Sequence, residues 1–395
     1  MEYRPYYLAR EWVRLGHCVT VVAASESHLR SVQPATSSAY TREALDGINY
    51  IWCRTPHYSG NGVGRVINIF AFLRQLAKHR SWLDFRPDAV IASSTYPLDI
   101  FPARRIARLA KCPLVWEVHD LWPRSPIELG GMSPLHPFIL LLQAAENEAC
   151  RSADLVVSLL PCAKQYLVQH GMTDSKFLYI PNGIDPAEWK TEATALTPTP
   201  ITSFVEKERN RGRLTIGYAG GHGISNALES MVEAASLTRD QPISWILIGK
   251  GPEKAALEAQ ARQAGLDNLI LFDPVPKSAI PAVLRSMDVL YIGFQRQPLY
   301  RFGISPNKLM DYMMAARPII CAVEAGNDPV TEAGCGFTIP PESSQQLAAA
   351  ALKFAAMSAS ERNNMGAAGR RFVEAQHTYP MLAQRFLDAM LRLRT

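Results

Sequence analysis

A lysine and an aspartate follow a serine–proline pair in the segment SPNKLMDYMMAARPII, residues 305–320. Ser305 is a preferred N-cap residue and Pro306 suits the first helical position, so the segment predicts a helix that starts here. The free N–H groups and the positive dipole end of such a helix start can bind an anion. Lys308 adds a positive charge in the first turn, where an ordinary helix favours an acid.

Lys308 and Asp311 are three residues apart, so both side chains can lie on one helix face. A phosphate beside Lys308 and a ribose diol beside Asp311 would fit a nucleotide. The alternative is an ordinary surface ion pair between the two side chains on a well-capped helix. In the first interpretation Lys308 is catalytic, and the donor-binding residues of this segment are Gly303, Ile304, Ser305, Asn307 and Asp311.

Two glycine turns follow strand-like runs in the same half of the chain. Gly220, Gly221 and Gly223 lie in YAGGHGISNALE, and Gly249 and Lys250 lie in IGKGPE. Glycine lets a ligand phosphate or sugar approach the backbone closely. The first turn does not have the GxGxxG spacing of a dinucleotide site. Both turns are therefore donor-binding candidates, with plain βα turns and a solvated lysine as the alternative.

His119 and Asp120 end the strand-like run CPLVWEV in the first half of the chain. Ligands of open α/β sheets bind beyond the carboxyl ends of the strands. We therefore expect His119 to be catalytic and Asp120 to lie on the acceptor side. The alternative is a histidine with only a structural role.

The stretch 56–83 contains no acidic residue but carries Arg65, Arg74, Lys78 and Arg80. Its apolar residues have helical spacing, which predicts a basic amphipathic helix lying on an anionic membrane surface. Arg65 and Arg74 are then candidates for the acceptor side. The alternative is a helix packed on its own sheet with a basic outer face. The apolar residues are Val66, Ile69, Phe70 and Leu73.

Strand-like runs alternate with helical stretches along most of the chain, which predicts an α/β protein with two Rossmann-like βα domains. An aperiodic segment rich in Thr, Pro and charge separates them. The predicted organisation is a first domain at 1–188, a linker at 189–213, a nucleotide-binding domain at 214–375 and a last helix at 376–395 that could belong to either domain.

Composition excludes several classes of protein. The 395 residues are 48% hydrophobic with a net charge of +5, which permits an anionic partner but predicts no nucleic-acid binding. The seven cysteines include no CxxC pair, so neither a disulfide framework nor a zinc site is expected. No apolar run reaches the length of a membrane span and no secretory signal is visible, so a cytoplasmic location is expected.

Taken together, these motifs resemble the retaining glycosyltransferases of the GT-B fold, family 4 type, over nearly the whole chain. The branch that looks most similar is that of bacterial surface-polysaccharide enzymes, including the fucosamine transferase-like ones. The resemblance implies a UDP-sugar donor, a lipid-linked glycan acceptor and no metal or other cofactor. The motifs in chain order are GHCVTVVAAS, VHDLWP, IPNGID, YAGGHGISNALE, IGKGPE and SPNKLMDYMMAARPII.

The chain departs from the pattern of this family at several points. Asp311 stands where the family more often has Glu, and Gly303 stands where it has a second Glu. The first glycine turn lacks the usual Arg and Lys, a charge that Lys308 would replace. The family begins with a strand and a glycine loop, whereas Met1 falls directly at the following helix. We therefore expect a gap in the first sheet beside CVTVVAA, from a misassigned start or a truncation.

Two other functions remain open at this stage. One is a nucleotide-sugar epimerase, which shares the architecture. The other is a truncated, non-catalytic subunit that binds a nucleotide sugar. Donor binding without turnover would indicate the binding subunit, and the products formed from free UDP-sugar would separate the epimerase from the transferase.

Overall fold

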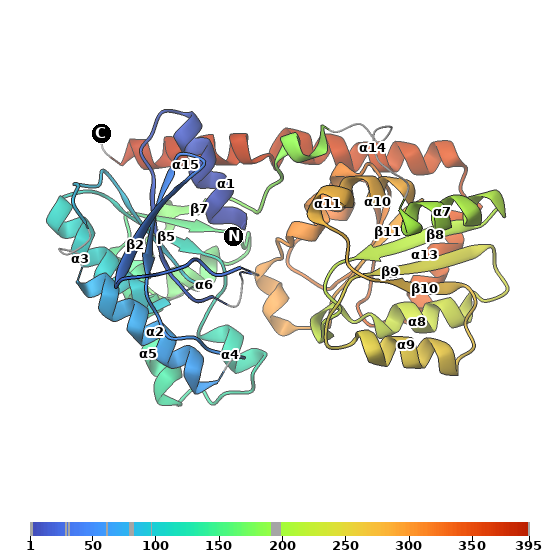
Figure 1. Ribbon diagram of the computed structural model, residues 1–395, viewed down its shortest axis with the longest axis horizontal. Coiled ribbons are helices and arrows are strands. Elements are labelled where there is room, and N and C mark those ends of the chain that lie inside the picture. Colours follow the sequence, from blue (N-terminus) through green and yellow to red (C-terminus); the bar gives the residue numbers. More distant parts are fainter. Residues whose placement is uncertain are drawn as a thin grey trace. The chain divides into compact units, whose positions relative to one another are not determined.

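The chain divides into two compact units, whose elements are labelled in Figure 1. The first comprises Met1–Asn182, Phe302–Ile304 and Tyr379–Thr395, and the second comprises Gly183–Arg301 and Ser305–Thr378. The computed structural model describes residues 3–27, 30, 32–60, 62–78, 83–95, 97–190 and 199–393.

The strands of the first unit form two separate sheets. One has the order β1-β3-β2, in which β2 is antiparallel to β3, and the other is the parallel sheet β4-β5-β6-β7. The strands are β1 Thr20–Ala24, β2 Tyr40–Leu45, β3 Ile48–Cys53, β4 Val90–Ser93, β5 Leu114–Val118, β6 Leu155–Ser158 and β7 Phe177–Tyr179. The helices are α1 Tyr3–Arg14, α2 Val63–Ala77, α3 Ile100–Ala110, α4 Arg124–Glu128, α5 Pro137–Ser152, α6 Lys164–Gln169 and α15 Tyr379–Arg392.

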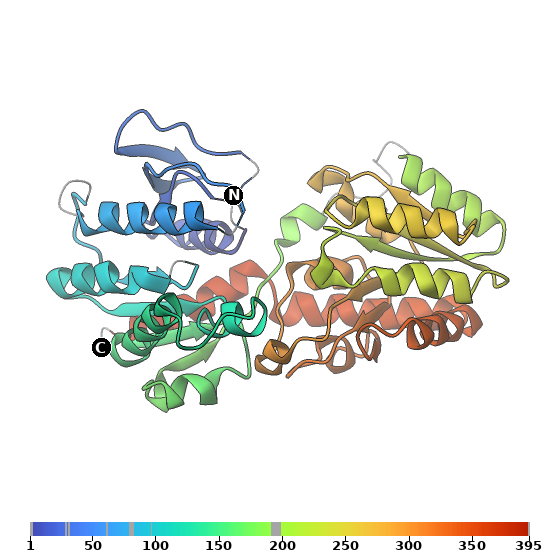
Figure 2. The same cartoon turned by 90° about the horizontal axis from the view of Figure 1, so that it is seen from below.

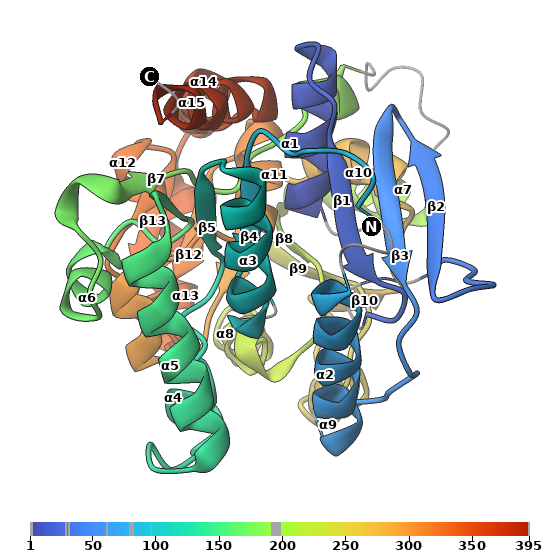
Figure 3. The ribbon, with the colours of Figure 1, turned by 90° about the vertical axis from the view of Figure 1, so that its left-hand side faces the viewer.

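The predicted gap beside CVTVVAA is confirmed. Within the described residues, β1 pairs only with β3 and β4 pairs only with β5, so each has one edge without a neighbouring strand. Figure 3 shows β1, β3 and β2 as a ribbon of their own beside α1. The predicted strands form as expected, but the sequence patterns missed the hairpin of β2 and β3 and the strands β7 and β13.

The last helix, left open by the sequence, packs on the first helix in the first unit. The ring of Tyr7 in α1 stacks on that of Tyr379 in α15 at a centroid distance of 4.7 Å. The indole of Trp12 donates a hydrogen bond of 2.9 Å to the carbonyl of Ala383. These buried contacts hold α1 and α15 together on one side of β5 and β6.

The second unit contains one continuous parallel sheet with the order β10-β9-β8-β11-β12-β13, covered by helices on both faces (Figure 2). Its strands are β8 Leu214–Ala219, β9 Ile243–Ile248, β10 Leu269–Phe272, β11 Val289–Gly293, β12 Ile319–Ala322 and β13 Gly336–Ile339. Its helices are α7 Pro200–Asn210, α8 Glu229–Leu237, α9 Lys254–Gln263, α10 Ile280–Ser286, α11 Asn307–Met314, α12 Pro329–Glu332, α13 Ser344–Ala356 and α14 Ala359–Gln376.

The segment predicted as an aperiodic linker at 189–213 contains helix α7. Thr199 caps this helix and forms a capping box with Thr202. The buried residues Ile201 and Val205 attach the helix to the second unit. Residues 191–198 lie outside the described part of the chain. The composition rich in Thr and Pro therefore marked a helix cap as much as a linker.

We find no helix in the described part of the chain that is both long and apolar enough to cross a membrane.

Candidate functional site

Lys308 lies in the first turn of helix α11, as the sequence predicted, but the helix starts later than expected. It begins at Asn307, and Pro306, not Ser305, occupies the N-cap position. Pro306 has the extended ψ of 128°, so it cannot be the first helical residue. The prediction of Ser305 as N-cap is therefore wrong by one residue.

The ammonium group of Lys308 binds to neutral partners from the first glycine turn. Its Nζ donates hydrogen bonds of 2.7 Å to the hydroxyl of Tyr218 and 2.9 Å to Oδ1 of Asn226. The same Nζ lies 4.4 Å from the centroid of the Tyr218 ring, which adds a cation–π contact. Burial lowers the pKa of Lys308 to about 8. No described carboxylate pairs with this lysine, so the surface ion pair with Asp311 does not form.

Three neighbours of Lys308 were not predicted from the sequence. Tyr218 also donates to the carbonyl of Gly221 at 2.7 Å, and Asn226 donates to the same oxygen at 3.0 Å, so the turn and the lysine form one network. Tyr312 accepts a hydrogen bond of 2.8 Å from the N–H of Ala219, which fixes α11 to the end of β8. The spacing of Tyr312 four residues after Lys308 places both on one helix face and could have indicated its role.

The two glycine turns pack against each other. At some of the glycines this packing leaves no room for a side chain. A Cβ on Gly249, whose φ is +146°, would lie 1.9 Å from the carbonyl oxygen of Gly220. A Cβ on Gly220 would lie 2.9 Å from Cε of Lys308. A Cβ on Gly221 would meet nothing within 4 Å, and one on Gly223 would meet only Nδ2 of Asn226 at 3.8 Å. Gly220 and Gly249 therefore serve packing, whereas Gly221 and Gly223 leave the backbone accessible.

Asp311 faces different neighbours from those of Lys308. Burial raises the pKa of its carboxyl group to about 7, and the charge of Lys277 opposes this rise. Lys277 itself forms an ion pair of 2.8 Å with Glu188. Asp311 is thus poised between its neutral and its charged form near pH 7, whereas the sequence suggested only a shared face with Lys308.

The remaining predicted donor residues are divided between the two units. Gly303 and Ile304 belong to the first unit, where the neighbouring Phe302 accepts a hydrogen bond of 3.0 Å from the N–H of Cys162. Ser305 and Asn307 belong to the second unit. The side chain of Lys250 is exposed, and its carbonyl accepts a hydrogen bond of 2.9 Å from the N–H of His222, a buried residue that the sequence did not single out.

His119 follows β5 in the first unit and is held by a buried carboxylate. Its Nε2 lies 2.9 Å from one oxygen of Glu117, and Nε of Arg4 lies 2.8 Å from the other. The N–H of His119 donates to the hydroxyl of Ser94 at 2.8 Å. Burial alone would raise the pKa of Glu117, but the charges of Arg4 and His119 outweigh it and lower the pKa to about 2. The sequence predicted His119 but neither Glu117 nor Arg4.

The other predicted residues of the first unit are only partly gathered around His119. The N–H of Asp120 shares the hydroxyl of Ser94 at 3.3 Å, and burial raises the pKa of the Asp120 carboxyl group. The guanidinium of Arg65 lies 5.2 Å from the Trp122 ring centroid. Arg74 is exposed and lies nine residues further along α2, about 14 Å away at the helical rise. The structure therefore does not group Arg74 with Arg65.

Helix α2 is amphipathic, but its buried face differs from the predicted one. The buried residues are Asn68, Ile69, Phe72 and Leu76, and Phe70 is 48% exposed. The outer face carries Val63, Ile67, Phe70 and Arg74 at successive helical turns, all exposed. Figure 3 shows α2 beside α3 on this side of the unit. Arg80 lies outside the described residues.

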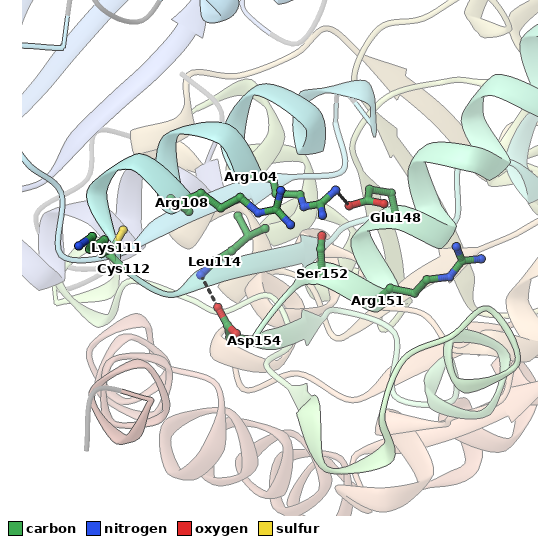
Figure 4. A pocket seen from close by; sticks show the side chains of 10 residues that line it. Arg104, Arg108, Lys111, Cys112, Leu114, Glu148, Arg151, Ser152 and Asp154 are labelled. Carbon is green, nitrogen blue, oxygen red and sulfur yellow. Dashed lines mark hydrogen bonds and ion pairs between the residues drawn. The ribbon is translucent and has the colours of Figure 1, made fainter.

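The first unit also has a basic hollow of about 550 Å³ that the sequence did not indicate (Figure 4). It lies at the start of β5, where the N–H of Leu114 donates to Asp154 at 2.8 Å. Arg104 points to Glu148 and pairs with it. The strand starts there, so this hollow and His119 lie at opposite ends of β5.

Among the described residues, no group of three His, Cys, Asp or Glu side chains could hold a metal ion.

Comparison with known proteins identifies both halves of the chain. Residues 1–183 match the family described as glycosyl transferase 4-like domain, and residues 213–356 match glycosyl transferases group 1. The chain is built from two glycosyltransferase domains of the GT-B fold.

Solved structures share the fold of this glycosyltransferase. HepE of Anabaena, in complex with UDP and glucose, is 16% identical with a TM-score of 0.62, covering 87% of this chain and 86% of HepE. A UDP-forming α,α-trehalose-phosphate synthase from Burkholderia xenovorans is 16% identical with a TM-score of 0.71 and covers 91% of each chain.

Two curated relatives of this glycosyltransferase share less than 30% sequence identity with it. The glycosyl transferase WcaI of Escherichia coli K12, assigned to colanic acid biosynthesis, is 24% identical over 86% of this chain and 84% of its own. The 2-deoxystreptamine glucosyltransferase of Streptomyces kanamyceticus is 29% identical over 47% of this chain and 46% of its own.

Proposed function

We propose that this glycosyltransferase moves a sugar from a UDP-sugar to a lipid-linked glycan during the synthesis of a surface polysaccharide. We further propose that it is a retaining enzyme of the family 4 type and transfers a hexosyl or N-acetylhexosaminyl group. The colanic acid assignment of the relative WcaI supports the pathway class, and the UDP bound by HepE supports the donor class.

The observation that carries this proposal is the buried ammonium group of Lys308 beside the glycine turn. When the bond between the sugar and the diphosphate breaks, negative charge develops on the leaving diphosphate. Lys308 is already oriented by Tyr218 and Asn226, and its third proton is available to a phosphate oxygen. The first-turn N–H groups of α11 add to this stabilisation. The reaction then requires no metal.

Asp311 and His119 have separate roles in this proposal. The carboxylate of Asp311 binds the ribose hydroxyls of the donor. His119 contacts the reacting sugar, and Glu117 keeps its ring in place. Gly221 and Gly223, which leave the backbone accessible, line the path of the diphosphate and the sugar.

The acceptor implies a membrane surface, and we propose that helix α2 lies on it from the cytoplasmic side. The outer stripe of Val63, Ile67, Phe70 and Arg74 combines apolar side chains with a positive charge. Such a face suits the boundary between anionic headgroups and acyl chains.

The test is a transfer assay with the full chain, UDP-sugars labelled in the sugar, and lipid-linked acceptors extracted from membranes. Label in the lipid fraction together with free UDP supports the transferase, and the anomeric configuration of the product tests retention. A changed free UDP-sugar without acceptor would indicate the epimerase. UDP binding without any product would indicate the binding subunit. Activity that disappears with EDTA would contradict the metal-independent mechanism.

A further inference from the structure

The basic hollow at the start of β5 carries more positive charge than its own carboxylates balance (Figure 4). Arg104 forms an ion pair with Glu148. The cations Arg108, Lys111 and Arg151 form no ion pair with any described residue. The charged residues of the lining are Arg104, Arg108, Lys111, Arg151, Glu148 and Asp154.

Two of these cations lie one helical turn apart. Arg104 and Arg108 are four residues apart on α3, so their guanidinium groups share one helix face. Like charges at this spacing destabilise a helix. Glu148 of α5 compensates Arg104 only, so an anion bound in the hollow would supply the compensation that Arg108 lacks.

A buried hydroxyl group provides a second, independent observation. Oγ of Ser152, the last residue of α5, is buried and has no hydrogen-bond partner among the described residues. Ser152 lines the hollow, and in Figure 4 its oxygen points toward the side on which Arg104 and Arg108 lie. A buried hydroxyl group without a partner destabilises the fold. An anion in the hollow would accept the hydrogen bond that this hydroxyl group can donate.

These donors suit a phosphate group better than a carboxylate. Arg108 approaches the hollow from α3 and Ser152 from α5, so the hydrogen bonds come from two different elements. The oxygens of a tetrahedral phosphate can accept from several directions at once, whereas a carboxylate offers two oxygens in one plane. The planar guanidinium fork also matches the spacing of phosphate oxygens.

The rest of the lining indicates what the phosphate is attached to. The volume of about 550 Å³ exceeds that of a single ion and is typical of small-molecule sites. Glu148 and Asp154 disfavour a second anionic group, but their oxygens accept hydrogen bonds from hydroxyl groups. Ala107 and Leu114 add an apolar part to the lining. A phosphate ester with hydroxyl groups therefore fits both parts of the hollow.

We propose that the basic hollow is a second ligand site, which binds a hydroxylated phosphate ester with the phosphate on Arg108 and Ser152 and the hydroxyl groups on Glu148 and Asp154. A soluble sugar or polyol phosphate and a lipid headgroup share this chemistry. The site is independent of the transfer reaction, because the hollow lies at the start of β5 and His119 follows the other end of this strand.

The experiment compares two sources of the phosphate ester on the full chain. Calorimetry at fixed salt measures the binding of glycerol 3-phosphate and of inorganic phosphate. Co-sedimentation measures binding to phosphatidylcholine vesicles with and without phosphatidylglycerol. The test variants are Arg108→Glu and Ser152→Ala. The matched control is Arg105→Glu, because Arg105 is an exposed residue of the same helix that does not line the hollow. The unfolding temperature of each variant without ligand checks its fold.

We expect Arg108→Glu to weaken the binding of glycerol 3-phosphate at least about tenfold, and Ser152→Ala to weaken it about two- to tenfold. Arg105→Glu should change it by less than about twofold, because salt screens an exposed charge outside the hollow. Inorganic phosphate should bind the parent more weakly than the ester, and equal affinities would overturn the role given to the two carboxylates.

The vesicles decide between the two sources. Binding to phosphatidylglycerol vesicles alone, lost in Arg108→Glu and kept in Arg105→Glu, would assign the phosphate to a lipid headgroup. Binding of glycerol 3-phosphate with the same dependence would assign it to a soluble ester. Equal losses in Arg105→Glu and Arg108→Glu, or binding of neither probe by the parent, would overturn the proposal.

Discussion

The groups around Lys308 and His119 differ in whether a buried charge has an oppositely charged partner within the protein. Lys308 has only neutral hydrogen-bond partners, Tyr218 and Asn226, and burial lowers its pKa to about 8. His119 contacts the carboxylate of Glu117 through Nε2, and this carboxylate also forms an ion pair with Arg4. The first group keeps an uncompensated positive charge, whereas the second is balanced within the protein.

The difference indicates what each group can do. A buried cation without a counter-ion destabilises the fold and gains most when an anionic ligand arrives. A compensated histidine gains little from an anion, but its ring orientation is fixed before any substrate binds. This difference supports the proposed roles, which are charge stabilisation by the Lys308 group and positioning by the His119 group.

The largest effect should follow from His119→Ala. Turnover should fall by about 10²–10⁴-fold, the range for a positioned side chain that acts on the reacting group. UDP affinity should not change, because the contact is with the sugar. Turnover assays and calorimetry with UDP measure the two quantities. Turnover within a few-fold of the parent would show that His119 is only structural and would remove one side of the comparison.

Glu117→Gln should destabilise the protein by about 3–5 kcal/mol, because it leaves Arg4 buried without its partner. The pKa of Glu117 is lowered from 4.5 to about 2, so its stabilisation is present above pH 4.5 and is lost as the pH falls towards 2. The unfolding free energy of the variant should therefore depend less on pH in this window, measured by urea denaturation.

A paired variant serves as the control for this prediction. Arg4→Met combined with Glu117→Leu removes both charges and should recover much of the lost stability. If the single variant unfolds in acid just as the parent does, the ion pair does not account for the stability of this end of the sheet.

Lys308→Ala should weaken UDP binding by about 1.5–3 kcal/mol, the worth of a hydrogen bond to a charged group. Lys308→Arg keeps the charge and is the matched control, so it should lose less. Calorimetry with UDP at fixed salt distinguishes them. If both variants bind UDP like the parent, the lysine has only a structural role beside Tyr218 and the donor site must lie elsewhere.

Removing basic residues should weaken membrane binding when they lie in the first unit but not when they lie in the second. Arg74→Ala with Lys78→Ala should weaken binding to anionic vesicles by about 1 kcal/mol per residue. The matched control removes Arg239 and Arg262, two exposed charges of the second unit, and should have no effect. Co-sedimentation with vesicles of known anionic content is the measurement. Equal sedimentation of both variants and the parent would contradict the assignment to α2.

The smallest effect is a shallow pH optimum of UDP affinity. Burial raises the pKa of Asp311 to about 7 and lowers that of Lys308 to about 8. Affinity should rise as Asp311 ionises and fall as Lys308 loses its proton, with a maximum between these values. Asp311→Asn should flatten the acid side only, and Lys308→Arg the alkaline side only. A parent profile without a maximum would show that the two groups do not act on one ligand.

Much of the fold could be predicted because local patterns agree with it. Apolar β-branched runs followed by helical stretches predicted nine of the thirteen strands in the described residues, and β2, β3, β7 and β13 were missed. The hairpin of β2 and β3 was missed although its turn, Asp46–Gly47, is a strong hairpin signal: both residues have positive φ, 52° and 79°. Helix α7 was missed because its proline-rich start resembles a linker.

The sequence by itself determined which residues could carry charge or leave the backbone open: Lys308, Asp311, His119 and the glycines are chemically suited wherever they lie. Only the tertiary structure decided their partners. Arg4 and Glu117 are separated by more than a hundred residues, and Tyr218 and Lys308 by ninety, so no local period relates them. Burial, which sets the pKa values and leaves the Lys308 charge uncompensated, arises only when distant strands and helices pack together.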